Sequence, residues 1–100
     1  MKYVIDEEKG SVLLKIEEDL LNTQNSEELK TILNELYTKG YKNIEIDLSK
    51  VKATNSSGIG KILFFYKKLS EEGGSLKIKA INPELRETFE LLRLDKLFGI

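Results

Sequence analysis

The stretch Ile44-Glu-Ile-Asp-Leu-Ser-Lys-Val-Lys-Ala-Thr-Asn-Ser-Ser-Gly-Ile-Gly60 contains a strand, a short polar connection and the start of a helix. From Ile44 to Leu48 apolar and polar residues alternate, which predicts a strand with one buried face. The next apolar residues recur at roughly helical spacing: Ile59, Ile62, Leu63, Tyr66 and Leu69. Between the two lies Asn55-Ser56-Ser57, whose side-chain oxygens can accept from the free amides of a first helical turn. The stretch therefore predicts a β-α unit that presents two serine hydroxyls where its helix begins.

The residues before this stretch predict two strands and a helix. Residues 2–6 and 12–17 are expected to form an antiparallel hairpin, because a polar turn with Gly10 joins them. Residues 18–24 read as a loop, after which Asn25 is expected to cap a helix, with Glu28 completing a variant of the capping box. Gly40 is expected to end this helix. Its apolar stripe consists of Leu29, Ile32, Leu33, Leu36 and Tyr37.

The residues after this stretch predict one more strand and one more helix. The central helix ends at Gly73-Gly74, and residues 76–80 alternate as a strand. Asn82-Pro83-Glu84 begins a third helix, because proline suits the first helical position, where no amide donor is needed. Its expected apolar stripe is Leu85, Phe89, Leu92 and, at the margin, Leu91. Residues 97–100 form either a last short strand or a packed tail.

The alternation within the strands predicts the layer architecture. Strands that are buried on both faces read as continuous apolar runs, whereas here lysines and acidic residues occupy the second face of three strands. We therefore predict one α/β domain over residues 1–100: two layers, with a mixed sheet of four to five strands and helices mainly on one face. Such a domain lacks a deep crevice on both sides of its sheet, so no cofactor is expected.

Composition excludes several classes of function. The net charge of −1 provides no basic face for nucleic acid. The absence of cysteine rules out disulfides and thiolate chemistry, and the absence of histidine removes the usual general base and the commonest metal ligand. No segment is long and apolar enough to span a membrane, and the N-terminus reaches acidic residues too early for a signal peptide. The cytoplasm is therefore the expected compartment.

The sequence motifs do not match those of catalytic sites. A nucleophilic serine needs a base, and no lysine or acidic residue stands at a recognised spacing from Ser56 or Ser57. Gly58-Ile-Gly60-Lys61 is too short for a phosphate-binding loop. The acidic pairs and triplets are typical of solvated surfaces, so no metal site is expected. The aromatic run Phe64-Phe65-Tyr66 is best interpreted as core and rim packing.

The two serines allow two interpretations, which are compatible with each other. In the first, one of them caps the central helix, and Gly58 permits a close backbone approach. In the second, a hydroxyl here is a phosphorylation target, because a phosphoryl group at a helix N-terminus meets free amides and the positive end of the dipole. The added charge, near −2, could repel a partner that binds there.

The central stretch also resembles a known family. Asp47-Leu-Ser-Lys-Val-Lys-Ala-Thr-Asn-Ser-Ser-Gly-Ile-Gly60 is similar to the central motif of STAS domains, the anti-sigma factor antagonists of bacteria. In that motif a strand ending Asp-Leu-Ser leads through a link to Asp-Ser-Ser-Gly-Leu-Gly at the start of a helix. Segments in the family's order extend the resemblance over nearly the whole chain: Asn25–Lys30, Glu72–Lys77, Asn82-Pro83 and Leu94–Ile100.

The resemblance implies a function as a protein-interaction switch, and not as an enzyme. In the family an unphosphorylated antagonist binds an anti-sigma factor, often a serine kinase, and thereby frees a sigma factor; the kinase ends the interaction by phosphorylating the antagonist, and a phosphatase resets it. By position the phosphoacceptor is Ser56. The implied partner-binding residues are Asn22, Asn55, Ser57, Gly58 and Ile59.

Two positions depart from the family's pattern. The acidic residues expected before the phosphoacceptor and in the loop after the second strand are Asn55 and Asn22 here. Asparagine keeps the ability to cap a helix but carries no charge. An alternative function therefore stays open, in which the domain is a scaffold subunit of a larger signalling or transport assembly and is not switched.

Overall fold

The computed structural model describes residues 1–100 and contains six strands and four helices. The strands are β1 (Tyr3–Glu8), β2 (Ser11–Ile16), β3 (Leu20–Leu21), β4 (Asn43–Leu48), β5 (Ala53–Thr54) and β6 (Ser75–Ile81). The helices are α1 (Thr23–Thr38), α2 (Ser56–Glu71), α3 (Pro83–Leu91) and α4 (Leu94–Phe98).

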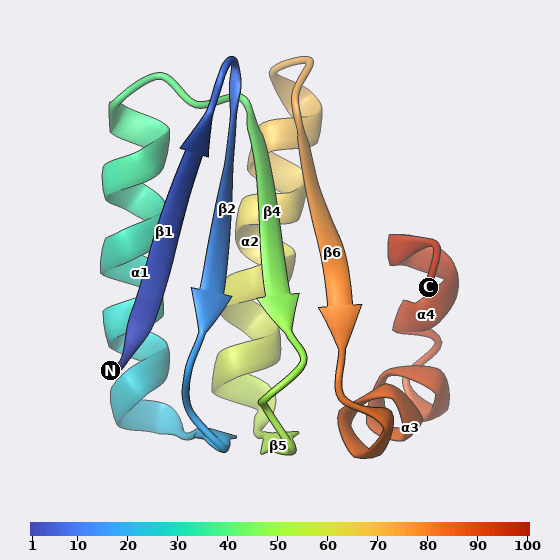
Figure 1. Ribbon diagram of the computed structural model, residues 1–100. Helices are drawn as coiled ribbons and strands as arrows, with labels where there is room; N and C mark the ends of the chain where they lie inside the picture. Colours follow the sequence, from blue (N-terminus) through green and yellow to red (C-terminus); the bar gives the residue numbers. More distant parts are fainter.

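The main sheet is mixed and has four strands in the order β1-β2-β4-β6. β1 and β2 form the predicted antiparallel hairpin, whereas β2, β4 and β6 run parallel. The parallel strands all end at the same edge of the sheet, at the bottom of Figure 1. The turns that lead into α1 and α2 therefore lie close together at that edge.

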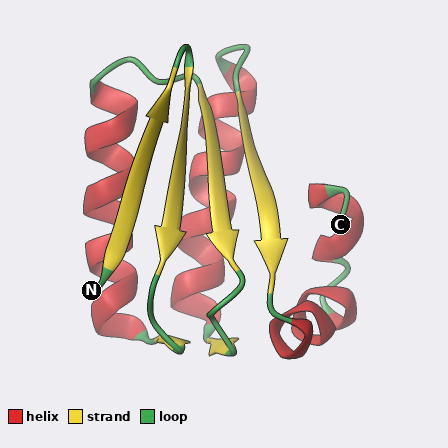
Figure 2. Ribbon diagram, viewed as in Figure 1, coloured by secondary structure: helices red, strands yellow, loops and turns green.

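The helices confirm the predicted two-layer arrangement. α1 and α2 lie behind the sheet in the view of Figure 2, while α3 and α4 lie beside β6. The inward residues of β2 and β4 are almost fully buried, and the outward residues are not. On the open face, opposite charges face each other across neighbouring strands, as Lys15 does with Asp47 and Glu45 with Lys77. The second face of the sheet is thus polar, as the alternation predicted.

The start of α1 differs from the prediction. Asn22, and not Asn25, is the N-cap: its Oδ1 accepts a hydrogen bond of 2.9 Å from the Asn25 amide. The helix begins earlier because the preceding residues are held in place, with Leu21 buried and β3 paired with β5. The predicted loop at residues 18–24 therefore contains a two-residue strand and the first residues of a helix. Strands of this length carry no periodicity that a sequence could reveal.

The end of the chain differs as well. Leu85 and Phe89 are buried as expected, but Leu91 is 84% exposed and Leu92 53% exposed. The helix stops there, and Arg93 has the left-handed conformation that turns the chain into α4. The C-terminal residues thus form a short helix, and Phe98 packs edge-on against Tyr66. Of the two alternatives for residues 97–100, the strand is absent, whereas the packed tail is confirmed, because Phe98 and Ile100 pack against the core.

The two adjacent phenylalanines of α2 provide a matched test of this packing. Phe65 is 1% exposed and belongs to the core, whereas Phe64 is 56% exposed. We expect Phe65→Ala to lower the free energy of unfolding by about 3–5 kcal/mol, because it leaves a cavity in the core. Phe64→Ala should cost less than about 1 kcal/mol. Urea denaturation followed by circular dichroism measures both, and similar losses would contradict the assigned orientation of α2.

Candidate functional site

The starts of α1 and α2 lie side by side at the edge where the parallel strands end (Figure 1). The short pair β3 and β5 holds both turns together, and the Thr54 hydroxyl donates to the Leu21 carbonyl at 3.0 Å. Asn55 Nδ2 donates to the Thr23 hydroxyl at 3.1 Å, which joins the first residue of α1 to the cap of α2. Two helix N-termini therefore face solvent from one surface, with their positive dipole ends adjacent.

Each of the two helices is capped by an asparagine. Asn22 Oδ1 accepts from the Asn25 amide, and Asn55 Oδ1 accepts from the Gly58 amide at 3.2 Å. The interpretation that a serine caps α2 is therefore wrong. An N-cap residue has an extended backbone, and Asn55 is the residue that has it, whereas Ser56 is already the first residue of the helix. Both serine hydroxyls are thereby left free of the capping role.

Gly58 brings α2 close to the elements beside it. A Cβ atom at this position would lie 2.1 Å from Thr54 Oγ1, 3.2 Å from Ser26 Oγ and 3.4 Å from Leu21 Cβ. Thr54 is itself tied to Leu21 by its hydrogen bond, so it cannot simply turn away. Ser26 is completely buried and donates to the Asn22 carbonyl at 2.6 Å. The absence of a side chain at Gly58 thus allows the two helix starts to approach each other.

The residues predicted to form the site are brought together by this arrangement. Ser56 is the first residue of α2 and is exposed, and its hydroxyl makes no hydrogen bond within the chain. Asn22 and Asn55 are exposed beside it, Ser57 and Ile59 are half-buried, and Gly58 is buried beneath them. We call Asn22 together with residues 55–61 the switch surface; Ile62 is only 1% exposed and belongs to the core. Gly58, which was predicted as a partner-binding residue, lies beneath this surface and is not exposed on it.

Sequence reasoning missed several residues that contribute to this surface. Leu20 is 53% exposed and adds apolar area next to Asn22. Thr23 and Thr54 connect the two helix starts through their hydroxyls. These residues lie 31 positions apart in the chain, in segments without regular spacing. The only available signal was their polarity next to a predicted helix start, and it does not show which side chains meet.

Acidic residues border the switch surface on the α1 side. A hollow of about 420 Å³ beside Asn22 is lined by Glu17, Glu18 and Asp19. Lys50 Nζ lies 2.6 Å from Glu17 Oε2, and this hydrogen bond lowers the pKa of the Glu17 carboxyl and raises the pKa of Lys50. Because the pKa of Glu17 is lowered and that of Lys50 is raised, both groups are charged at neutral pH; the pair is lost in acid when Glu17 is protonated, and in strong alkali when Lys50 loses its proton. The surface thus has a charged border although its caps are neutral.

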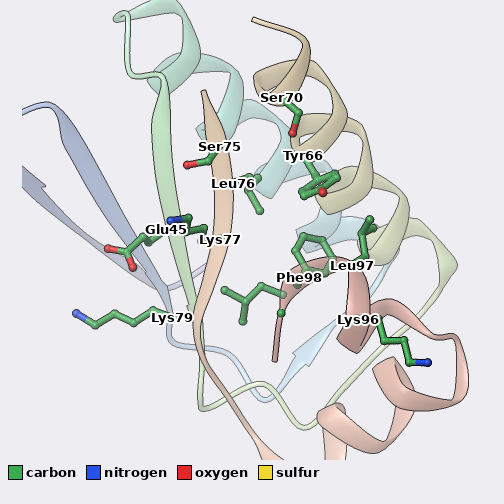
Figure 3. Close-up of a pocket in the computed structure, with 12 residues that line it drawn as sticks. Glu45, Tyr66, Ser70, Ser75, Leu76, Lys77, Lys79, Lys96, Leu97 and Phe98 are labelled. Carbon is green, nitrogen blue, oxygen red and sulfur yellow. The ribbon is translucent and has the colours of Figure 1, made fainter. Parts of the chain in front are cut away.

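The cavities give no support to a small-molecule site at Ser56. The hollow beside Asn55 has a volume of about 160 Å³, below the range of roughly 300–1,000 Å³ typical of ligand pockets. A larger cleft of about 600 Å³ lies between β6, α2 and α4 (Figure 3). Its residue Tyr66 is ten positions beyond Ser56 on α2, roughly 15 Å along the helix axis. The hydroxyl at the switch surface is therefore remote from it.

Comparison with known proteins identifies the family. The STAS domain model matches residues 2–100, and the chain belongs to the STAS family. Over 100 residues it is 27% identical to the "Putative anti-sigma factor antagonist BtrV" of Bordetella bronchiseptica, covering 100% of this chain and 85% of that protein. Over 81 residues it is 30% identical to a "Putative anti-sigma factor antagonist" of Thermotoga maritima, covering 80% of this chain and 72% of the other.

A solved structure confirms the fold. The crystal structure of a "putative anti-sigma factor antagonist" from Thermotoga maritima superimposes with a TM-score of 0.82 at 26% identity, over 94% of this chain and 80% of that one. The predicted family and the predicted mixed two-layer fold are both confirmed by these matches. Separately, no helix of the structure has the length and apolar character required to cross a membrane.

The close approach at Gly58 can be tested against another glycine of the same helix. Gly58→Ala should lower the free energy of unfolding by about 1–3 kcal/mol, because the new methyl group overlaps Thr54. Nothing lies within 4 Å of a Cβ at Gly60, so Gly60→Ala should raise it by about 0.5–1 kcal/mol. Urea denaturation measures both changes. A Gly58→Ala protein as stable as Gly60→Ala would show that the helix starts are not tightly apposed.

Proposed function

We propose that this chain is an anti-sigma factor antagonist that binds an anti-sigma factor through the switch surface and is released by phosphorylation of Ser56. Both relatives carry the name of this class, which supports the binding of an anti-sigma factor. The observation that carries the proposal is the position of Ser56: an exposed, unbonded hydroxyl at the start of α2, beside the start of α1. The proposed setting is the cytoplasm, where sigma factors act.

Binding in the unphosphorylated state would use contacts of several kinds. Leu20 and Ile59 offer apolar area, and the exposed sides of Asn22 and Asn55 offer amide groups. Glu18 and Asp19 place carboxylates at the border of the surface, where they suit a partner with lysine or arginine residues. These acidic residues could supply charge near the surface in place of the acids that Asn22 and Asn55 lack.

Phosphorylation would change the surface without disturbing the fold. In the kinase, the Ser56 oxygen attacks the γ-phosphorus of ATP, the bond from that phosphorus to ADP breaks and ADP leaves, and a base of the kinase takes the hydroxyl proton. Ser56 thereby gains a group with a charge near −2. The first amides of α2 and its dipole favour a negative group at this position, so the helix tolerates it. A partner seated over Ser56 would have to bury that charge, and the complex weakens as a result. The anti-sigma factor, as a serine kinase, is the proposed source of the phosphoryl group, and a phosphatase would return the serine.

The proposal assigns binding to this chain, and not catalysis. A nucleophilic serine needs a base within hydrogen-bonding distance, and the Ser56 hydroxyl has no such contact. The hollow beside Asn55 is also too small for most ligands. The role that suits the exposed hydroxyl is therefore that of a substrate for another protein's kinase.

The switch is tested with Ser56→Asp and Ser56→Ala. Ser56→Asp should weaken binding to the cognate anti-sigma factor by about tenfold or more, which corresponds to about 1.4 kcal/mol. Ser56→Ala should bind within about threefold of wild type, because the hydroxyl has no partner to lose. Isothermal titration calorimetry measures the dissociation constants. The thermal midpoint of Ser56→Asp should not fall, since an acidic residue suits the first turn of a helix.

Ser70→Asp is the matched control, because it adds the same charge to an exposed residue near the opposite end of α2. Its affinity should stay close to that of wild type. Equal binding by the Ser56→Asp, Ser56→Ala and wild-type proteins would refute the switch. Equal losses in Ser56→Asp and Ser70→Asp would point to net charge alone as the cause.

A second candidate function keeps the fold and removes the switch: a STAS scaffold subunit within a larger signalling or transport assembly. The neutral caps favour it, because Asn55 precedes Ser56 where the family has an acid. Incubation with the cognate kinase and ATP, followed by intact-mass measurement, separates the two functions. If the chain is switched by phosphorylation, the wild-type protein should gain about 80 Da, the mass of one phosphoryl group, and the Ser56→Ala protein should show no such gain. Unchanged mass in the wild type would favour the scaffold.

A further inference from the structure

The two edges of the main sheet differ in how they are protected. An edge strand can pair with another chain unless bulges, lysines or covering elements prevent it. β6 has the first two: a register shift that leaves Lys79 without a partner residue, and two exposed lysines, whereas a cleft of about 600 Å³ separates it from α4. β1 has no bulge, no proline and no lysine within its six residues, every one of which is exposed, and its charged residues are the three acids Asp6, Glu7 and Glu8 at one end. β1 lacks the register shift and the lysines of β6, and is therefore the edge strand that is less protected against pairing.

The hydrogen bonds of β1 show which of its backbone groups are free. The Glu17 amide donates to the Lys2 carbonyl, so Lys2 faces β2. Because successive residues of a strand face opposite ways, Val4 and Asp6 also face β2, and the backbone groups of Tyr3 and Ile5 point outward. No hydrogen bond outside the helices and strands engages these outward groups. They form a free template for one more antiparallel strand.

The side chains at this edge are apolar and incompletely covered. Tyr3, Val4 and Ile5 are 42%, 51% and 37% exposed. Tyr3 and Ile5 lie opposite Ile16 and Leu14 and so point to the helix side of the sheet. Ile16 and Leu14 are fully buried, whereas Tyr3 and Ile5 are not, although α1 lies behind β1 in Figure 1. A partner strand beside β1 would therefore cover part of this exposed apolar surface.

We propose that β1 pairs with β1 of a second copy of this chain, antiparallel and centred on Val4. In this register the outward backbone groups of Tyr3 meet those of Ile5 of the partner subunit. Lys2 then lies opposite Asp6 of the partner subunit, on the open face of the sheet. Neither Lys2 nor Asp6 has an ion pair within its own chain. The strand is thus complementary to itself in hydrogen bonding, in apolar contact and in charge.

This pairing leaves the switch surface accessible. An antiparallel pair within one sheet is related by a two-fold axis perpendicular to that sheet. The edge where the parallel strands end, which carries Ser56, therefore points in opposite directions in the two copies. The dimer would present two separate switch surfaces, and its formation does not depend on the function proposed for them.

Disulfide trapping tests the pairing, because the natural chain has no cysteine. In the proposed register Val4 faces Val4 of the partner subunit as a non-hydrogen-bonded pair, with side chains close enough to be bridged. Val4→Cys should form a covalent dimer under mild oxidation about tenfold faster than Phe64→Cys, because pairing raises the effective thiol concentration. Phe64 is the matched control, since it is 56% exposed and lies on α2, away from β1. Non-reducing electrophoresis measures both rates.

Further variants test the register of the pairing and whether the β1 edge is required for dimer formation. Adding Ile5→Lys to Val4→Cys should abolish the rate advantage, and sedimentation should show a dimer for the wild type but a monomer for Ile5→Lys. Circular dichroism confirms that each variant is folded. Equal trapping rates for Val4→Cys and Phe64→Cys, or a wild type that stays monomeric at millimolar concentration, would overturn the proposal. Faster trapping of Ile5→Cys than of Val4→Cys would also overturn it, because the pairing would then centre elsewhere.

Discussion

The contact at Gly58, where the start of α2 meets the start of α1, is the constraint on which the site depends. With no side chain at this position, α2 comes within contact distance of Thr54, Ser26 and Leu21. The hydrogen bond from Thr54 to Leu21 and the pairing of β3 with β5 hold the same junction from the other side. Ser56 lies two residues from Gly58 and is exposed because the backbone around it is fixed and Asn55 provides the cap. A loosely placed helix start could not present its hydroxyl in one orientation.

Different surfaces of the domain have different roles. One face of the sheet forms the core with α1 and α2, and the opposite face carries cross-strand charges. Both helix starts lie where the parallel strands end, and the exposed Ser56 hydroxyl lies there with them. The capping asparagines satisfy helix amides without adding charge, so a phosphoryl group at Ser56 would be the dominant charge at that position. Because the caps are neutral, the proposed phosphorylation of Ser56 would produce a large change in the local charge of the surface.

The open β1 edge adds a second kind of contact, directed away from the switch surface. Pairing through the backbone groups and three apolar side chains of β1 would be independent of Ser56. That residue lies at the C-terminal end of the parallel strands, and not along β1. A dimer of this kind would double the number of docking surfaces without changing either one. The register shift of β6 and its exposed Lys77 and Lys79 would keep such dimers from growing into longer assemblies.

The sequence by itself determined the elements with regular periodicity and the family. The alternation from Ile44 to Leu48, the hairpin around Gly10 and the helix stop at Gly40 were all predicted and are present. The motif around Ser56 indicated the STAS family, which the family match confirms. These features depend on neighbouring residues, so their signal is contained in a short window of sequence.

Only the tertiary structure decided how separate segments meet. The cap at Asn22 depends on the pairing of β3 with β5, and the exposure of Leu91 depends on where α3 leaves the core. The link between Asn55 and Thr23 joins residues that no local pattern relates. Such contacts follow from the global path of the chain, because distant segments are brought together only when the whole core forms. Periodicity reports which face of an element is apolar, but it does not report which other element covers that face.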